Sequence, residues 1–156
     1  MLLLATQLAV IATGLVAGVF LTFSDFVMRS LAASEAIAGA EAMQEINRKV
    51  YGSIFLTLFL GMTAGSAGLI GAGLLTGGPA APWLIGGGAI YLSCVFGVTV
   101  LGNVPMNQRL DALPPADKTT LDYWGEYAVR WTRLNHVRTI GSAAAAIAFL
   151  IAAQRL

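Results

Sequence analysis

Charged residues are scarce in this chain. Asp, Glu, Lys and Arg make up 11% of its 156 residues, against about a quarter in soluble proteins, and 57% of the residues are hydrophobic. The net charge is only +1, so the chain offers neither a basic surface for nucleic acid nor a strong charge for an acidic partner. We therefore expect an integral membrane protein that binds no nucleic acid.

Histidine and cysteine are scarcer still, since His136 and Cys94 are the only ones. One cysteine cannot form an intramolecular disulfide, and one histidine with one cysteine cannot form the usual His-rich zinc or non-haem iron site. Neither a nucleotide-binding loop nor a serine nucleophile elbow is present. No cofactor is predicted, although a single axial histidine leaves haem open, and a metal held by amides and His136 is open too.

Long stretches of the chain contain no charged residue. Residues 1–24, 50–108 and 139–154 contain none, which gives room for four apolar helices of about 20 residues, the length that crosses a bilayer. A soluble bundle would need charged faces on these segments, and they have none. We expect an all-α, four-transmembrane-helix bundle that forms a single integral membrane domain over residues 1–156. Its spans are predicted at approximately 2–23, 51–76, 83–102 and 137–154.

Two polar segments separate the spans. In residues 23–50, Glu41 and Glu45 share one helical side while Met43 and Asn47 share the other, which predicts an amphipathic helical extension. After the third span, the run Asn103-Val104-Pro105-Met106-Asn107 predicts a break, because proline lacks an amide donor and disfavours helix at the preceding residue.

The basic residues are distributed asymmetrically. Eight of the nine Lys and Arg residues lie in residues 24–49 and 103–138, and Arg155 alone lies on the opposite side of a four-span chain. The positive-inside rule then places both polar connectors in the cytoplasm and both termini outside, in a bacterial-type plasma membrane.

The last segment, residues 122–156, carries most of the chemically useful side chains. At about 100° of rotation per residue, one face of a helix would present Trp124, Tyr127, Trp131, Asn135 and Arg138. Aromatic residues alone would suit an interfacial belt. An aromatic stripe that continues into an amide and a guanidinium is more typical of a site for a flat, mostly apolar ligand with a few oxygens.

The two polar connectors meet at one end of the bundle, which brings several amides toward Arg138. Unpaired amides and charges at membrane depth are costly, so we expect one connected polar cluster. It is either a structural network that caps helix ends or the mouth of a ligand pocket. In the second interpretation the substrate-binding residues are Asn47, Asn103, Asn107, Trp124, Tyr127 and Trp131.

Catalysis in such a pocket would need a base and an oxyanion partner. His136 would accept a proton, Arg138 would stabilise negative charge, and Asn135 would hold a ligand oxygen. His136 lies about 100° away from Asn135 on the helix, so it could instead face a neighbouring helix or the lipid headgroups.

Four short motifs occur in order along nearly the whole chain: Gly18-x-Phe20-x-x-Phe23-Ser24, Ala42-Met43-Gln44-x-Ile46-Asn47, Asn103-Val104-Pro105-x-Asn107 and Trp131-x-x-x-Asn135-His136-x-Arg138. This pattern resembles that of the small four-span proteins grouped with fungal anthrone oxygenases. The resemblance implies a monooxygenase-type oxidation of an anthrone to an anthraquinone by dioxygen, without a recognised cofactor. It suits the residues, because a deprotonated anthrone can itself reduce oxygen.

A non-catalytic function is the alternative. The protein would then bind a lipid-like or quinone-like ligand or act as a scaffold for a partner complex. In either case the expected partners are an apolar aromatic or quinone-like small molecule and membrane lipids. The sequence leaves the oligomeric state open, a homo-oligomer included.

Overall fold

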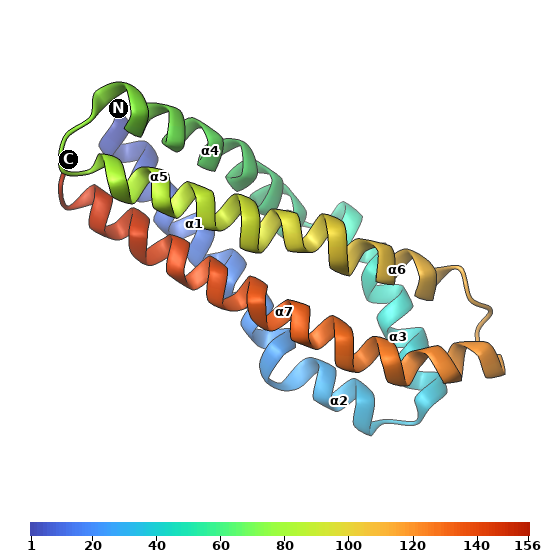
Figure 1. Cartoon of the computed structure of the whole chain (residues 1–156). Coiled ribbons are helices and arrows are strands. Elements are labelled where there is room, and N and C mark those ends of the chain that lie inside the picture. Colours follow the sequence, from blue (N-terminus) through green and yellow to red (C-terminus); the bar gives the residue numbers. More distant parts are fainter.

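The computed structural model describes all residues, 1–156, and contains helices but no strands. Its helices form an elongated bundle in which both chain termini lie at the same end (Figure 1). Four helical stretches are long and apolar enough to cross a membrane: Leu2–Ala33, Ile54–Thr76, Ala81–Asp111 and Lys118–Ala153. The predicted all-α bundle of four membrane helices is therefore confirmed.

Three of these stretches are α-helices interrupted by π-helical turns or preceded by a short helix. The first consists of α1 (Leu2–Thr22), a π-helical turn (Phe23–Val27) and α2 (Met28–Ala33). Next come α3 (Ala36–Lys49), a 3₁₀ turn (Val50–Gly52) and α4 (Ile54–Thr76). The third contains α5 (Ala81–Ile90), π-helical turns at Tyr91–Gly97 and Thr99–Asn103, and α6 (Val104–Asp111), and the last is the unbroken α7 (Lys118–Ala153).

The predicted break at residues 103–107 is wrong, because the third helix continues to Asp111. Pro105 lies in the first turn of α6, where the amide that proline lacks is less needed. The π-helical turn just before it is wider than an α-turn, which leaves room for the proline ring.

Small residues let the membrane helices approach closely. A methyl group at Gly87 would lie 2.8 Å from the Phe149 ring, and one at Gly141 would lie 2.7 Å from Cys94 Cβ. Large apolar side chains on the outside are exposed, as at Leu75 and Leu101. This arrangement fits lipid surroundings, where helices gain little from hydrophobicity and pack through close contact.

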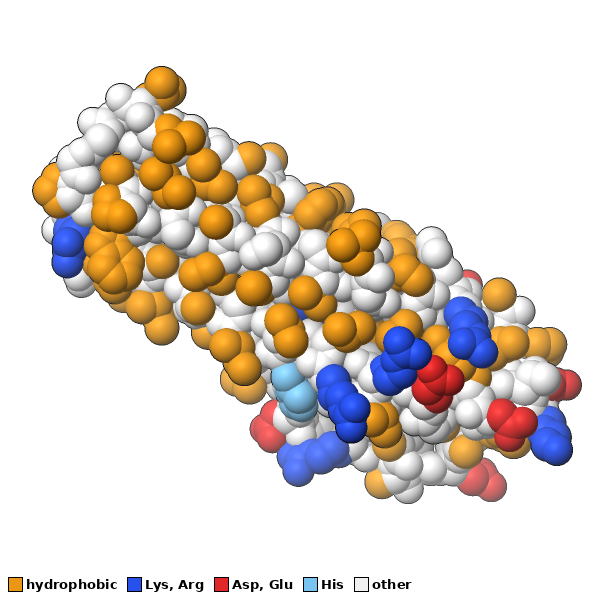
Figure 2. All heavy atoms as spheres, viewed as in Figure 1, with side chains coloured by type: hydrophobic (Ala, Val, Ile, Leu, Met, Phe, Trp, Pro, Cys, Tyr) orange, Lys and Arg blue, Asp and Glu red, His pale blue; other side chains and the backbone are white.

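The polar end is built from α2, α3, α6 and the first half of α7, and charged side chains gather over it (Figure 2). Apolar side chains cover the other part of the surface in this view, except for a basic group near the termini. A separate small core lies inside the polar end and includes Met43, Leu110, Trp124, Tyr127 and Trp131. Which side of a membrane this end faces stays a prediction.

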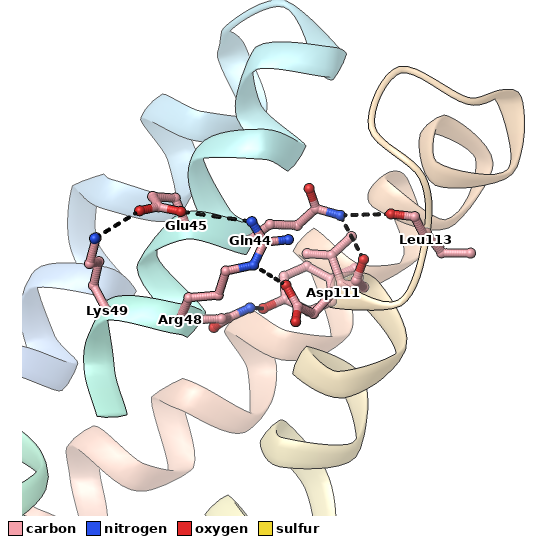
Figure 3. A network of polar contacts seen from close by, with 9 residues as sticks. Gln44, Glu45, Arg48, Lys49, Asp111 and Leu113 are labelled. Carbon is pink, nitrogen blue, oxygen red and sulfur yellow. Dashed lines mark hydrogen bonds and ion pairs between the residues drawn. The ribbon is translucent and has the colours of Figure 1, made fainter. Parts of the chain in front are cut away.

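Helix α3 is the expected amphipathic extension, and polar contacts attach it to the end of α6 (Figure 3). The buried Gln44 amide donates to the carbonyl oxygens of Leu110 at 2.8 Å and Leu113 at 3.1 Å. On the exposed side, Arg48 Nε donates to Asp111 Oδ1 at 2.7 Å. These contacts attach α3 to the end of the third membrane helix.

Candidate functional site

A cavity of about 370 Å³ lies where the apolar half of the bundle meets the polar end. This volume falls in the usual range for small-molecule sites, about 300–1,000 Å³. The cavity is partly open; it is bounded by α1, the α3–α4 junction, the third helix and α7, and its lining is mostly hydrophobic. Six aromatic rings contribute to it: Phe20, Phe23, Tyr51, Phe55, Phe59 and Trp131. Such walls suit a flat apolar ligand.

Arg138 is the only buried charged residue in the chain, and it lines this cavity. Its guanidinium donates to Asn135 Oδ1 at 2.7 Å and to Thr99 Oγ1 at 3.4 Å, and no carboxylate lies within ion-pair distance. The guanidinium carbon is 4.4 Å from the centre of the Phe20 ring and 4.9 Å from that of Trp131. A buried cation without a counter-charge is costly, and an anionic ligand would relieve that cost.

One nitrogen of this guanidinium, Nε of Arg138, is buried and has no hydrogen-bond partner. The other cation of the lining, Lys49, differs from Arg138 in exposure and in pairing. It is exposed at the rim and pairs with Glu45 at 3.3 Å. Arg138 is therefore the group in the cavity that can bind an oxyanion away from water.

Asn135 holds Arg138 in place rather than lining the cavity. Its amide nitrogen donates to the Phe20 carbonyl and to Ser24 Oγ, each at 2.7 Å, while its oxygen accepts from Arg138. These acceptors flank the start of the π-helical turn in the first helix, and Thr99 begins such a turn in the third. π-Helical turns are frequent at functional sites because they reposition side chains within a helix.

A second polar group of the cavity is the amide of Asn107. Its oxygen accepts hydrogen bonds from Tyr127 OH at 2.9 Å and from Trp131 Nε1 at 2.8 Å. Because indole N–H can only donate, this pair fixes which way the amide is turned. The NH₂ group of Asn107 is left without a protein partner. Asn47 donates to Tyr127 OH at 3.4 Å, which ties it to the same network.

The structure brings part of the predicted cluster together. Asn47, Asn107, Trp131 and Arg138 all line the cavity. Asn135 and Tyr127 stand behind them. Asn103 is buried against the Trp131 carbonyl, to which it donates at 3.3 Å, and Trp124 stacks on Tyr127 inside the polar end. The roles of these residues stay predictions.

His136 is not brought to the site. Its side chain is exposed and visible on the surface of α7 (Figure 2), and it is absent from the cavity lining. The physical reason is the helical rotation of about 100° between neighbours, which turns His136 away when Asn135 faces inward. The expectation that His136 shares a pocket with Asn135 and Arg138 is therefore not met.

Several lining residues could not be assigned from sequence. Phe20 and Phe23 belong to a noted motif, but Phe55, Phe59 and Thr99 lie in uniformly apolar spans. In such spans the hydrophobic pattern does not separate a lipid-facing side from a cavity-facing one. The only signal was residue type, an aromatic ring at Phe55 and Phe59 and a hydroxyl at Thr99.

The donor set does not favour a metal of the common kinds, since no group of three or more His, Cys, Asp or Glu side chains lies together. The expectation of a cofactor-free protein stays a prediction.

A family model described as anthrone oxygenase matches residues 43–148. The matched region runs from α3 into the second half of α7, and it contains Asn47, Thr99, Asn107, Trp131 and Arg138. No curated protein and no solved structure matches the chain.

Proposed function

Because this chain belongs to the anthrone oxygenase family, we propose that it is a membrane-embedded oxygenase that oxidises a flat, anthrone-like aromatic with dioxygen. The observation that carries the proposal is the buried guanidinium of Arg138, which has no counter-charge and faces an aromatic cavity. No organic cofactor is part of the proposal, since the substrate itself provides the electrons.

The reaction starts with loss of a proton from the methylene carbon of the anthrone. The electron pair left behind is delocalised onto the carbonyl oxygen of the anthrone, and this enolate oxygen lies against Arg138. The methylene carbon then gives electrons to dioxygen and forms a C–O bond. The peroxide anion formed takes up a proton from water, and the hydroperoxide then loses the remaining hydrogen of that carbon and its outer oxygen as water, so anthrone and dioxygen yield anthraquinone and water.

The residues of the cavity contribute to this reaction by holding and stabilising the substrate. The rings of Phe20 and Trp131 flank the Arg138 guanidinium and would hold the fused rings of the substrate beside it. Removing one group that stabilises an oxyanion lowers kcat by roughly 10²–10³-fold in well-studied enzymes. The cavity lining contains no histidine and no carboxylate, so the proton must leave the cavity.

The test uses full-length protein purified in mild detergent and incubated with anthrone in air. Anthraquinone is measured by chromatography after subtraction of spontaneous oxidation, and ¹⁸O₂ should place one labelled oxygen in the quinone. Arg138→Gln should lower the rate by about 10²-fold. Arg133→Gln, a change at an exposed position of the same helix, should not. Equal rates with and without the protein would contradict the proposal.

The absence of a histidine or carboxylate from the cavity lining favours one other function, which is the binding of a lipid-like or quinone-like anion without catalysis. The same cavity would then hold a ligand whose negative group rests on Arg138. Mass spectrometry of extracts from the purified protein would identify a bound ligand. A tightly held acidic lipid or quinone, together with no turnover of anthrone, would favour this second function.

A further inference from the structure

A second cavity, of about 50 Å³, lies beside the first on its polar side. Five of its six lining residues have polar or charged side chains; the six are Asn47, Arg48, Tyr51, Asn107, Gln108 and Asp111. A single water needs about 10–15 Å³ of such space and two or more polar partners, so this cavity has room for water. We call it the vestibule.

The vestibule and the main cavity adjoin each other, because Asn47, Tyr51 and Asn107 line both. Asn107 has the better-defined orientation of the two amides. Its oxygen is occupied by Tyr127 and Trp131, which leaves its NH₂ group as a free donor at the boundary. A water held there would touch both spaces.

Asp111 carries the only carboxylate that lines either cavity. It lies at the end of α6, where Arg48 donates to it at 2.7 Å and where 42% of its side chain remains exposed (Figure 3). The carboxylate therefore has contact with the vestibule on one side and with bulk water on the other. Glu45 and Lys49, the neighbouring charged groups on α3, pair with each other at 3.3 Å.

We propose that the vestibule is the hydrated route by which the proton leaves the main cavity, and that Asp111 receives it. This inference rests on the proposed function, which requires such an exit. The methylene C–H bond of the substrate breaks, its electron pair stays on the enolate beside Arg138, and the proton passes to water at Asn107. That water protonates the Asp111 carboxylate, which returns the proton to bulk water. The step needs no oxidant.

Other titratable groups are less well placed for this role. His136 is exposed on α7 and lines neither cavity. Lys49 lies at the rim of the main cavity but is a cation paired with Glu45, so it has no site for another proton. Asp111 acts through water and does not touch the substrate, so we regard it as a proton-relay residue.

The experiment isolates deprotonation from oxygen chemistry. Under anaerobic conditions in D₂O, the full-length protein in detergent should accelerate exchange of the anthrone methylene hydrogens for deuterium, measured by mass spectrometry. Asp111→Asn should slow this exchange by at least about tenfold, as expected for loss of a proton acceptor, with the KM for anthrone unchanged. Asp111→Glu, which restores a carboxylate, should recover most of the rate.

Two control variants separate the carboxylate from its structural role. Glu126 forms a matched 2.7 Å pair with Arg130 on the outer face of α7 and lines neither cavity, so Glu126→Gln should leave exchange unchanged. Gln44→Met removes the hydrogen bonds that join α3 to the end of α6 but keeps the carboxylate. It should lower the melting temperature and leave the exchange rate of the folded protein within about twofold.

Exchange by Asp111→Asn at the wild-type rate would overturn the proposal, as would an equal loss in Gln44→Met or no exchange at all in the wild type. Other outcomes would contradict the proposed oxygenase function but not the proton route, or the reverse. If the wild type exchanges hydrogens but forms no quinone in air, the proton route stands and the oxygenase function does not. If Asp111→Asn forms quinone as fast as the wild type, the route alone is wrong.

Discussion

Arg138 and His136 show how far two residues on one helix can differ. They are two positions apart, yet Arg138 is 5% exposed inside the cavity and His136 lies on the surface. Histidine is the usual proton acceptor near neutral pH, so residue type alone favours it. Position decides otherwise, because a base must come within hydrogen-bond reach of the proton it takes.

We therefore predict that His136→Ala leaves anthrone turnover within about twofold of the wild-type rate. A catalytic base would cost at least about 10²-fold when removed. The measurement is initial quinone formation by equal amounts of folded protein. A loss of that size in His136→Ala, with unchanged thermal stability, would mean that the site lies on the outer face of α7.

Helix α7 connects the two halves of the molecule, and its two glycines have opposite surroundings. A methyl group added at Gly141 would meet Cys94 Cβ at 2.7 Å, whereas at Gly125 nothing lies within 4 Å. Gly141 is needed where α7 packs against the third helix. Gly125 has no such constraint.

The pair gives a prediction for stability. Gly141→Ala should destabilise the protein by about 1–3 kcal/mol through overpacking. Gly125→Ala should stabilise it by about 0.5–1 kcal/mol through the better helix propensity of alanine. Unfolding in detergent measures both changes, and equal effects of the two substitutions would contradict the close packing at Gly141.

The start of α7 is capped by Asp117. The Asp117 carboxylate accepts from the Thr119 hydroxyl at 2.6 Å and from the Thr119 amide at 2.8 Å. The hydroxyl bond, more than the amide bond, holds the pKa of Asp117 below its usual value. The ionised form therefore caps the helix.

This capping should depend on pH. The pKa of Asp117 is lower in the folded state than its unfolded value of 3.8. The ionised cap therefore contributes fully to the stability of the folded protein above pH 3.8, and this contribution is lost as the pH falls through the folded-state pKa. Hydrogen-exchange protection of the first turn of α7 should decline in that acidic range. Asp117→Asn should remove the pH dependence, and a decline that persists in this variant would assign it to another group.

Some features of the helices could be predicted from the sequence and others could not. Charge-free runs required four membrane helices, and helical periodicity placed Trp131, Asn135 and Arg138 on one buried face, as observed. The π-helical turns were not predictable from local sequence; in the structure, the Asn135 side chain contacts the first helix where one of these turns begins. The cavity was also hidden, since its walls and the lipid-facing surface have the same composition.

Over the whole molecule, polarity is divided between the two ends. Both termini lie at the apolar end, and charges gather at the other (Figures 1 and 2). Because eight of the nine basic residues lie at the charged end, we predict from the positive-inside rule that this end faces the cytoplasm.

Single-cysteine reporters at Ala116 and Leu156, in a chain with Cys94 replaced by alanine, should test this arrangement. A membrane-impermeant thiol reagent applied to intact cells should label the Leu156→Cys protein and spare Ala116→Cys. Labelling of both from outside would show that the two sites lie on the same side of the membrane. The reversed pattern would show that the orientation is inverted.

The length of α7 sets the depth at which the cavity lies. Its 36 residues rise about 54 Å at about 1.5 Å each, whereas the hydrocarbon core is about 30 Å thick. About 20 residues counted back from Ala153 cross this core, so we expect Trp131 close to the headgroup level and Arg138 slightly deeper. A lipid-soluble ligand would reach them by diffusion in the plane of the bilayer, so occupancy would follow its mole fraction in the lipid. Adding empty liposomes should slow turnover, because it lowers the mole fraction of the substrate in the lipid. Adding the same volume of buffer should not slow it.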